Sequence, residues 1–350
     1  MTRQTAKDRN KTTYGGFTMT ANSTAKTYFI TGGAGFIGSH LSEALIAQGH
    51  SVIALDDLST GSVSNLENVI DNPNFSFVEA SVLNKEEVNR LAADSDIIVH
   101  LAAAVGVKLV TDEVIYTIET NIMGTQIVLE AALANKCKVM IASTSEVYGK
   151  NTKFPFNEED DVVLGPSSKS RWGYAASKMI DEFLGLAYHK EHGLDVVLFR
   201  LFNTVGPRQI GRYGMVIPRF VQQALQNDPL TVYSDGQQSR CFCDARDVVQ
   251  AIIKLSEAPD APGRVFNIGG LNEITILELA HKVKEMTNSS SPIIHVPLTE
   301  VYGEGFEETL RREPDLTRTQ STIDWEPTYT LEQTLQDIME VFKKELVAVG

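Results

Sequence analysis

The feature that most limits what this chain can fold into is a glycine-rich turn between a short apolar run and a helical run. Residues 27–38 read TYFITGGAGFIG, so Gly32, Gly35 and Gly38 follow a predicted strand and open a predicted helix. There, a first glycine permits a tight turn, a second exposes backbone N–H groups to a pyrophosphate, and a third lets helix and strand pack closely. An ordinary glycine-rich turn is the alternative, because a lone motif of this kind also occurs by chance.

The next predicted strand ends in an acidic residue that favours the dinucleotide interpretation. Asp56 follows Gly38 by 18 residues, and a carboxylate there can accept hydrogen bonds from both hydroxyls of an adenosine ribose. The same carboxylate would repel a 2′-phosphate, and residues 27–84 contain no Lys or Arg to neutralise one. The sequence therefore predicts NAD rather than NADP, with Asp57 either sharing this role or capping the following loop.

Short β-rich runs alternate with longer helical runs from residue 27 onward. Strands are expected within residues 28–31, 51–56, 75–80, 96–102, 138–144 and 195–203, and helices up to residue 48 and at about 114–135 and 174–192. The runs DIIVHLA and KVMIA are almost wholly apolar, as expected for strands buried on both faces. The pattern predicts an α/β protein with a doubly wound, parallel Rossmann sheet.

Beyond residue 206 the alternation breaks into segments punctuated by Pro and Gly. We therefore predict an NAD-binding domain mainly over residues 27–205 and a smaller mixed α/β substrate domain mainly over residues 206–350, with some exchange of chain between them. A final helix is expected at about residues 331–346. Residues 1–26 lack the apolar stretch of a secretory signal and are predicted to form a disordered extension.

Charge and cysteine usage exclude several classes of function. The chain has 31 basic and 45 acidic residues, a net charge of −14, so its field repels nucleic acid and anionic lipid. Its longest apolar runs are far shorter than the roughly 20 residues that cross a bilayer. The three cysteines form no CxxC pair and no zinc-ligand spacing. We expect no nucleic-acid partner, no membrane segment, no metal site, no disulfide framework and a cytoplasmic location.

A tyrosine and a lysine lie four residues apart in a predicted helix. Tyr174 and Lys178 share one helix face, where the Lys charge and a positively charged nicotinamide would favour the phenolate over the phenol. Tyr174 could then remove a hydroxyl proton during hydride transfer. Such spacing also arises by chance on exposed helices, but here it follows a strand that ends in Ser143, Thr144, Ser145 and Glu146.

The carboxyl ends of strands in an open α/β sheet are where ligands bind, which gives these four residues chemical meaning. The hydroxyl of Thr144 could hydrogen-bond the same substrate oxygen as Tyr174, and Glu146 could act in proton transfer. A surface turn is the alternative interpretation.

The segments TGGAGFIG, HLAAA, STSEVYG, YAASK and RLFNTVGPR, in this order, resemble the extended short-chain dehydrogenase/reductase family of nucleotide-sugar epimerases, dehydratases and decarboxylases. The resemblance covers residue 27 to the last helix. It implies that the first domain holds NAD, that the second closes over a UDP-sugar, and that two long helices pair in a homodimer. Thr144, Tyr174 and Lys178 match the family's catalytic trio, with Glu146 beside them.

The resemblance also implies two sets of binding residues. The cofactor-binding set is Gly32, Gly35, Phe36, Ile37, Gly38, Asp56, Asp57, Leu58, Thr60, Gly61, Ser81, Val82, Leu101, Ala102, Ala103, Asn121, Ser143, Tyr174 and Lys178. The substrate-binding set is Val105, Ser145, Arg171, Asn203, Arg208, Val216, Tyr233, Arg240, Arg312 and Asp315.

Within the family, GPSSKSRWGYAASK and the residues around Arg240 and Arg312 look most like decarboxylases of UDP-glucuronate, which share an Arg at position 171 and a TSE triplet. The implied reaction is oxidation at C4 of the sugar, followed by loss of the C5 carboxylate as CO₂. A 4-epimerase of UDP-glucuronate or UDP-glucose is the alternative. A 4,6-dehydratase and a non-catalytic NAD-binding regulator are further alternatives.

Overall fold

A computed structural model describes residues 13–14, 17–18, 25–106, 113–211, 215–302, 307 and 309–349. The predicted disordered extension therefore lies mostly outside the described residues. Within it, β1 (Thr13–Tyr14) and β2 (Phe17–Thr18) pair antiparallel.

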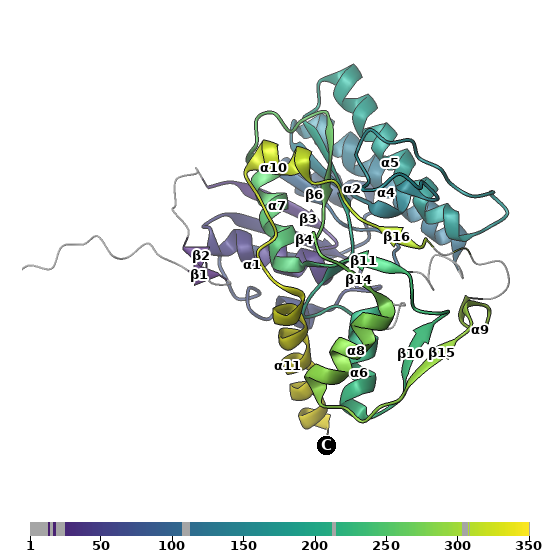
Figure 1. Ribbon diagram of the computed structural model, residues 1–350. Helices are drawn as coiled ribbons and strands as arrows, with labels where there is room; N and C mark the ends of the chain where they lie inside the picture. Colours follow the sequence, from purple (N-terminus) through teal and green to yellow (C-terminus); the bar gives the residue numbers. More distant parts are fainter. Residues whose placement is uncertain are drawn as a thin grey trace, which may run out of the picture.

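Parallel strands form the centre of the molecule (Figure 1). Within the described residues the main sheet has seven strands in the order β13-β8-β7-β6-β3-β4-β5, and every neighbouring pair is parallel. The strands are β3 (Thr27–Thr31), β4 (Ser51–Asp56), β5 (Phe75–Glu79), β6 (Ile97–His100), β7 (Lys138–Thr144), β8 (Val196–Leu201) and β13 (Arg264–Ile268). This confirms the predicted doubly wound sheet, and all four residues of β6 are buried, as its apolar run predicted.

Helices cover both faces of this sheet, as the crossover connections require. One face packs against α1 (Phe36–Ala47), α7 (Ala245–Glu257) and α10 (Thr317–Ile323), and the other against α2 (Lys85–Ala93), α4 (Val114–Asn135) and α5 (Arg171–His192). Alternate residues of β3 serve the two cores, because Tyr28 and Ile30 face the first helix layer while Phe29 faces the second.

The remaining elements form a smaller mixed unit beside the sheet. Its core lies between α6 (Val216–Gln226), α8 (Ile276–Thr287), α11 (Leu331–Val349), β10 (Leu230–Tyr233) and β15 (Ile293–Val296) (Figure 1). The strands β11 (Ser239–Cys241), β14 (Glu273–Thr275) and β16 (Arg311–Arg312) make a small sheet, β12 (Cys243–Asp244) pairs with β9 (Thr204–Val205), and α9 spans Leu298–Tyr302. Short 3-10 turns, η1 (Val63–Leu66) and η2 (Ser145–Tyr148), follow β4 and β7.

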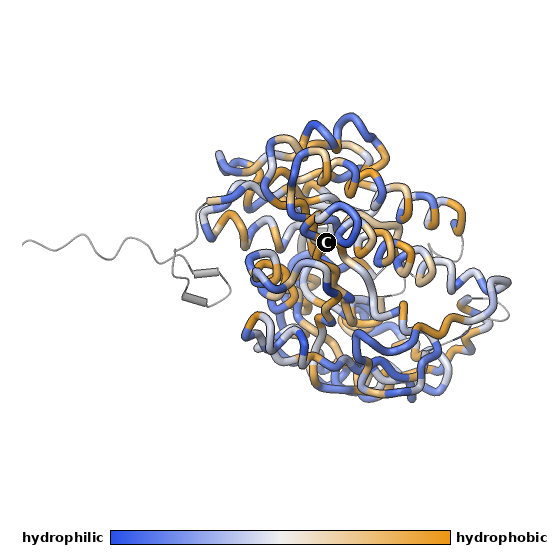
Figure 2. The backbone as a smooth tube through the Cα atoms, turned by 90° about the horizontal axis from the view of Figure 1, so that it is seen from above, coloured by the Kyte–Doolittle hydropathy of each residue, from blue (hydrophilic) through white to orange (hydrophobic). Residues whose placement is uncertain are grey.

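Past residue 206 the chain contributes elements to both units. β13 returns to the edge of the main sheet beside β8, and α7 and α10 return to its face. Most helices carry hydrophilic and apolar residues in alternation, as expected where one face is buried (Figure 2). In the part of the chain that the structure describes, no helix is long and apolar enough to cross a membrane.

Candidate active site

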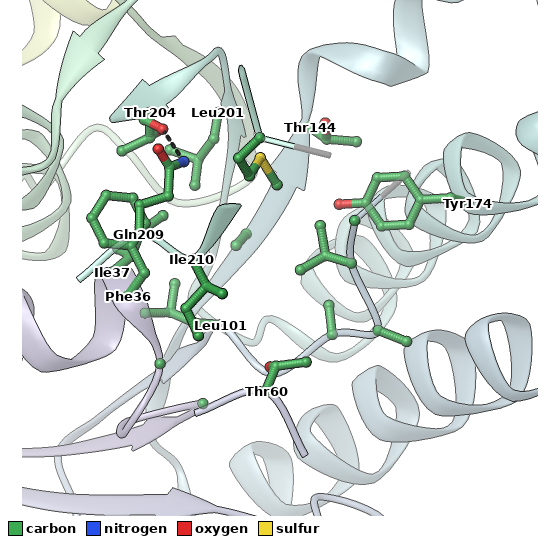
Figure 3. A pocket seen from close by; sticks show the side chains of 18 of the residues that line it. Phe36, Ile37, Thr60, Leu101, Thr144, Tyr174, Leu201, Thr204, Gln209 and Ile210 are labelled. Carbon is green, nitrogen blue, oxygen red and sulfur yellow. Dashed lines mark hydrogen bonds between the residues drawn. The ribbon is translucent and has the colours of Figure 1, made fainter. Parts of the chain in front are cut away.

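A cavity of about 810 Å³ opens at the carboxyl ends of the main-sheet strands and extends to the smaller unit (Figure 3). The sheet side contributes the glycine-rich turn after β3 and the ends of β4, β6 and β7, while α6, β10 and β11 contribute from the smaller unit. A site in this position follows from the fold, because the strand order reverses at β3 and leaves a crevice there.

The turn after β3 brings backbone very close to backbone. A Cβ on Gly38 would lie 2.2 Å from the Gly32 carbonyl oxygen, so the first turn of α1 can pack there only with glycine. The N-cap residue of α1, Gly35, makes no side-chain capping bond, and no acidic residue occupies the first turn. No acidic side chain from the first turn of α1 therefore competes for the N–H groups at this helix start, which suits a pyrophosphate.

Asp56 ends β4 inside the same cavity. Its carboxylate accepts hydrogen bonds from the Ala34 N–H at 3.0 Å and the Leu58 N–H at 2.9 Å. Burial raises its pKa, while these backbone bonds favour the ionised form. The cavity-lining residues from the segments after β4 and β5 include no Lys or Arg. A ribose with free hydroxyls fits this environment, whereas a 2′-phosphate would meet a carboxylate with no cation from these segments.

Thr144 and Tyr174 of the expected catalytic trio lie across the cavity from Phe36 and Ile37 (Figure 3), and Lys178, the third member, lines the same cavity. Thr144 ends β7 and accepts a hydrogen bond from the Glu146 N–H at 3.2 Å, which starts η2. Tyr174 and Lys178 lie one turn apart on α5. Burial raises the pKa of Tyr174, the negative charge of Glu146 adds to this, and a hydrogen bond with Thr144 opposes it. Deprotonation of Tyr174 thus needs added positive charge nearby.

Glu146 lies among three arginines that come from distant parts of the chain. Its carboxylate is 3.3 Å from Arg312 Nη1 and 3.8 Å from Arg171 Nη1. Burial opposes ionisation of Glu146, but the charges of Arg312, Arg171 and Arg240 outweigh it and hold its pKa below the ordinary range. Glu146 is therefore a carboxylate at neutral pH, and in this state it can accept a proton but cannot donate one.

The structure brings most of the predicted site residues together. Those that line the cavity are Gly32, Gly35, Phe36, Ile37, Gly38, Asp56, Asp57, Thr60, Val82, Leu101, Ala102, Ala103, Val105, Ser143, Thr144, Ser145, Glu146, Arg171, Tyr174, Lys178, Asn203, Arg208, Val216, Tyr233, Arg240 and Arg312. The predicted cofactor-binding residues and the predicted catalytic residues therefore line one cavity.

Five predicted binding residues lie outside the cavity lining: Leu58, Gly61, Ser81, Asn121 and Asp315. Gly61 closes its loop over Asp56, because a Cβ there would lie 2.8 Å from the carboxylate. Asn121 accepts a hydrogen bond from the Ala104 N–H at 2.9 Å and so supports a lining segment from behind. The Asp315 carboxylate accepts hydrogen bonds from the Asn157 side chain at 2.9 Å and from the Thr317 N–H at 2.9 Å. These bonds hold it against nearby residues of the same chain.

Some lining residues do not belong to the two predicted binding sets. Arg219 of α6 stacks on the ring of Tyr233 at 3.8 Å, and Tyr302 of α9 meets that ring edge-on at 5.8 Å. Thr204, Gln209 and Ile210 add a wall near Phe36, with the Gln209 amide donating to the Thr204 carbonyl at 2.8 Å (Figure 3). No sequence spacing indicates these contacts, because they depend on how the smaller unit packs against the sheet.

Comparisons with known proteins agree with this geometry. A Tyr and a Lys one helical turn apart at the carboxyl edge of a Rossmann sheet define a dehydrogenase-type site. The family model described as GDP-mannose 4,6 dehydratase matches residues 29–338. The chain belongs to the extended short-chain dehydrogenase/reductase family of NAD-dependent nucleotide-sugar epimerases, dehydratases and decarboxylases, as the sequence resemblance predicted.

Two curated relatives share a reaction type. The chain is 43% identical to UDP-N-acetyl-alpha-D-glucosaminuronate decarboxylase of Bacillus cytotoxicus, over 91% of this chain and 98% of that protein. It is 35% identical to UDP-glucuronic acid decarboxylase 1 of Arabidopsis thaliana, over 91% of this chain and 70% of that protein.

Solved structures with the same fold include enzymes that are named for other reactions. UDP-glucose 4-epimerase of Thermotoga maritima with UDP-glucose is 30% identical with a TM-score of 0.82, covering 91% of this chain and 99% of that one. DesIV, a dTDP-glucose 4,6-dehydratase of Streptomyces venezuelae solved with NAD and TYD, is 29% identical with a TM-score of 0.82. The match covers 91% of this chain and 97% of that one.

Proposed function

We propose that the protein is an NAD-dependent decarboxylase of a UDP-linked hexuronate. The observation that carries this proposal is the cluster of Arg171, Arg240 and Arg312 beside Thr144 and Tyr174. Three guanidinium groups act on the Glu146 carboxylate and line the same cavity. A ligand with both a diphosphate and a sugar carboxylate carries the anionic groups that guanidinium groups bind. The names of the two decarboxylase relatives support the same substrate class.

The residues at the other end of the cavity fit NAD. Gly32, Gly35 and Gly38 would hold its pyrophosphate against the start of α1, and Asp56 would accept hydrogen bonds from the adenosine ribose. NAD⁺ held by these residues would supply the hydride acceptor for oxidation at C4 of the sugar.

The protein's own side chains handle the proton and the developing charge. Tyr174 takes the proton of the 4-hydroxyl, with the Lys178 ammonium nearby to favour the phenolate. Thr144 hydrogen-bonds the same oxygen, which becomes the oxygen of a C4 ketone. The C5 carboxylate is then β to this ketone. As CO₂ leaves, the electrons of the broken bond flow into the ketone oxygen, which Thr144 and protonated Tyr174 stabilise by hydrogen bonding.

Glu146 and its arginines orient the sugar, and Glu146, once it has taken up a proton from water, would pass that proton to C5 of the enolate that remains after CO₂ leaves. Arg171 and Arg312 lie on the two oxygens of the Glu146 carboxylate, so a substrate carboxylate would compete with Glu146 for the same guanidinium donors. This places the leaving carboxylate next to an ionised Glu146, where the loss of its charge as CO₂ relieves like-charge repulsion.

The test is to incubate the protein with NAD⁺ and, in parallel, UDP-glucuronate or UDP-N-acetylglucosaminuronate, and to follow the sugar protons by NMR. A five-carbon sugar product supports the proposal, and the preferred substrate identifies the group at C2. A hexuronate with inverted C4 would show a 4-epimerase instead.

We further propose that the protein is a homodimer in a reducing compartment such as the cytoplasm. The long helices α4 and α5 pack together, and their outer faces expose Ile115 (74%), Met123 (51%) and Phe183 (66%). Large apolar side chains left exposed on two adjacent helices are typical of a protein interface, and a second copy presents the same surface.

The three cysteines are free and buried, which agrees with a reducing compartment.

A further inference from the structure

The lysine of the catalytic pair has an acidic partner that the mechanism above does not use. Lys178 Nζ lies 2.6 Å from Asp181 Oδ2, three residues further along α5. The side chains of Lys178 and Asp181 are 3% and 0% exposed. Solvent therefore screens this ion pair far less than a surface pair, and the charge of Asp181 acts strongly on its surroundings.

Neighbouring elements do not replace the charge of Asp181. Burial raises the pKa of Asp181, while the charge of Lys178, its hydrogen bond and that of the uncharged Thr125 hydroxyl on α4 favour the ionised form. On β6, His100 hydrogen-bonds Thr125 at 3.1 Å and Thr31 at 2.7 Å, and burial lowers the pKa of His100 to about 3, so this imidazole is neutral. Next to Asp181, Glu182 is paired with Arg200 of β8 at 2.7 Å. Asp181 is thus the acidic group that balances Lys178.

Asp181 also affects the tyrosine one turn away from Lys178. The charged groups that act on Tyr174 are Glu146 and Asp181, which disfavour the phenolate, and Arg312, which favours it. Lys178 has the same sign as Arg312 but is partly neutralised by its partner. Burial itself is the largest influence, and it keeps the phenol protonated in the free protein.

We propose that Asp181 is a positioning residue that fixes the Lys178 ammonium on the cavity side of α5 and offsets part of its charge, thereby setting the pH at which Tyr174 loses its proton. This inference rests on the proposed role of Tyr174 as the base, and not on which sugar is the substrate. Without Asp181, the full charge of Lys178 would favour the phenolate, and Tyr174 would release its proton at lower pH.

The test variant is Asp181→Asn, which removes the charge and keeps an oxygen that can accept a hydrogen bond from Lys178. Tyrosinate absorbance of the full-length free protein is titrated at alkaline pH, and the Tyr174 signal is isolated by subtracting the matching Tyr174→Phe protein. We expect about tenfold more Tyr174 tyrosinate at a given pH in Asp181→Asn, equal to a downward move of about one pH unit. The acidic limb of the pH profile for first-turnover NADH formation should move in the same direction.

A matched control is Glu191→Gln, which makes the same charge change at an exposed position near the end of α5. It should leave the tyrosinate titration unchanged. If Asp181→Asn fails to fold, Asp181→Ser removes the charge while retaining a hydroxyl acceptor. A purely structural role for Asp181 would lower thermal stability and activity equally at every pH with no change in the Tyr174 titration, and that result would overturn the proposal. Because the titration needs no sugar, it stays informative if the decarboxylase assignment fails.

Discussion

Replacing Gly38 by alanine should weaken NAD binding, and the expected size follows from the turn after β3. The new Cβ would lie 2.2 Å from the Gly32 carbonyl oxygen and 2.8 Å from the Gly33 Cα. An ordinary carbon-to-oxygen approach is about 3.3 Å, so the turn must open by about 1 Å. Both obstructing atoms belong to the backbone, and no side-chain rotation can relieve the contact.

Overpacking of this kind costs about 1–3 kcal/mol. In the free protein the turn can relax, but relaxation moves the N–H groups away from the positions that would hold a pyrophosphate. We therefore expect the cost to appear mainly in binding, as an NAD affinity roughly tenfold to a hundredfold weaker than that of the wild type.

Isothermal titration calorimetry with NAD⁺ measures this effect directly, with thermal unfolding recorded on the same samples. Gly35→Ala provides a graded comparison, because its Cβ would lie 3.1 Å from the same Gly32 oxygen. Leu41→Ala, in the buried face of α1, controls for a general loss of stability, and it should bind NAD normally while folded. An affinity of Gly38→Ala within about twofold of the wild type would refute the reasoning.

Four further results are expected. Tyr174→Phe should lower kcat for C4 oxidation by at least about a hundredfold at unchanged NAD affinity, which stopped-flow detection of NADH would show. Glu146→Gln should lower the stability of the protein at neutral pH, because it removes the carboxylate that pairs with Arg171 and Arg312. The pKa of Glu146 is held below its ordinary range, so the stabilisation by Glu146 is present at neutral pH and is lost as pH falls through that lowered value. The unfolding curves of the two proteins should therefore converge in acid. Asp56→Asn should reduce the preference for NAD over NADP about tenfold in competition binding, because it removes the repulsion of a 2′-phosphate. Phe183→Glu should shift the protein toward monomer in analytical ultracentrifugation, whereas an unchanged mass would contradict the proposed α4–α5 interface.

The sequence predicted those parts of the fold that depend on local periodicity. The helix expected at residues 114–135 is α4 with the same ends, and α5 begins at Arg171, three residues before the expected start at Tyr174. Strands β6 and β7 were recognised because both of their faces are buried, which leaves an uninterrupted apolar run. The glycine-rich turn and Asp56 were likewise readable, since their chemistry requires a fixed spacing along the chain.

Features that depend on distant packing were not predicted. Some exchange of chain between the domains was expected, but not its location: the segment around β13, placed in the smaller domain from its Pro and Gly punctuation, completes the edge of the main sheet beside β8, a pairing that no local pattern encodes. Arg219 reaches the cavity only because α6 packs beneath Tyr233. The spacing of Lys178 and Asp181 was visible in the sequence, but their burial, which makes the pair consequential, was not.

The most direct test of the decarboxylase proposal is release of the carboxyl carbon. The protein is mixed with NAD⁺ and UDP-hexuronate labelled at C6, and labelled CO₂ is measured against substrate consumed, with Tyr174→Phe as the control. We predict one CO₂ for each sugar nucleotide consumed and none above background with Tyr174→Phe. Consumption of substrate with the label retained in the sugar nucleotide would contradict the account.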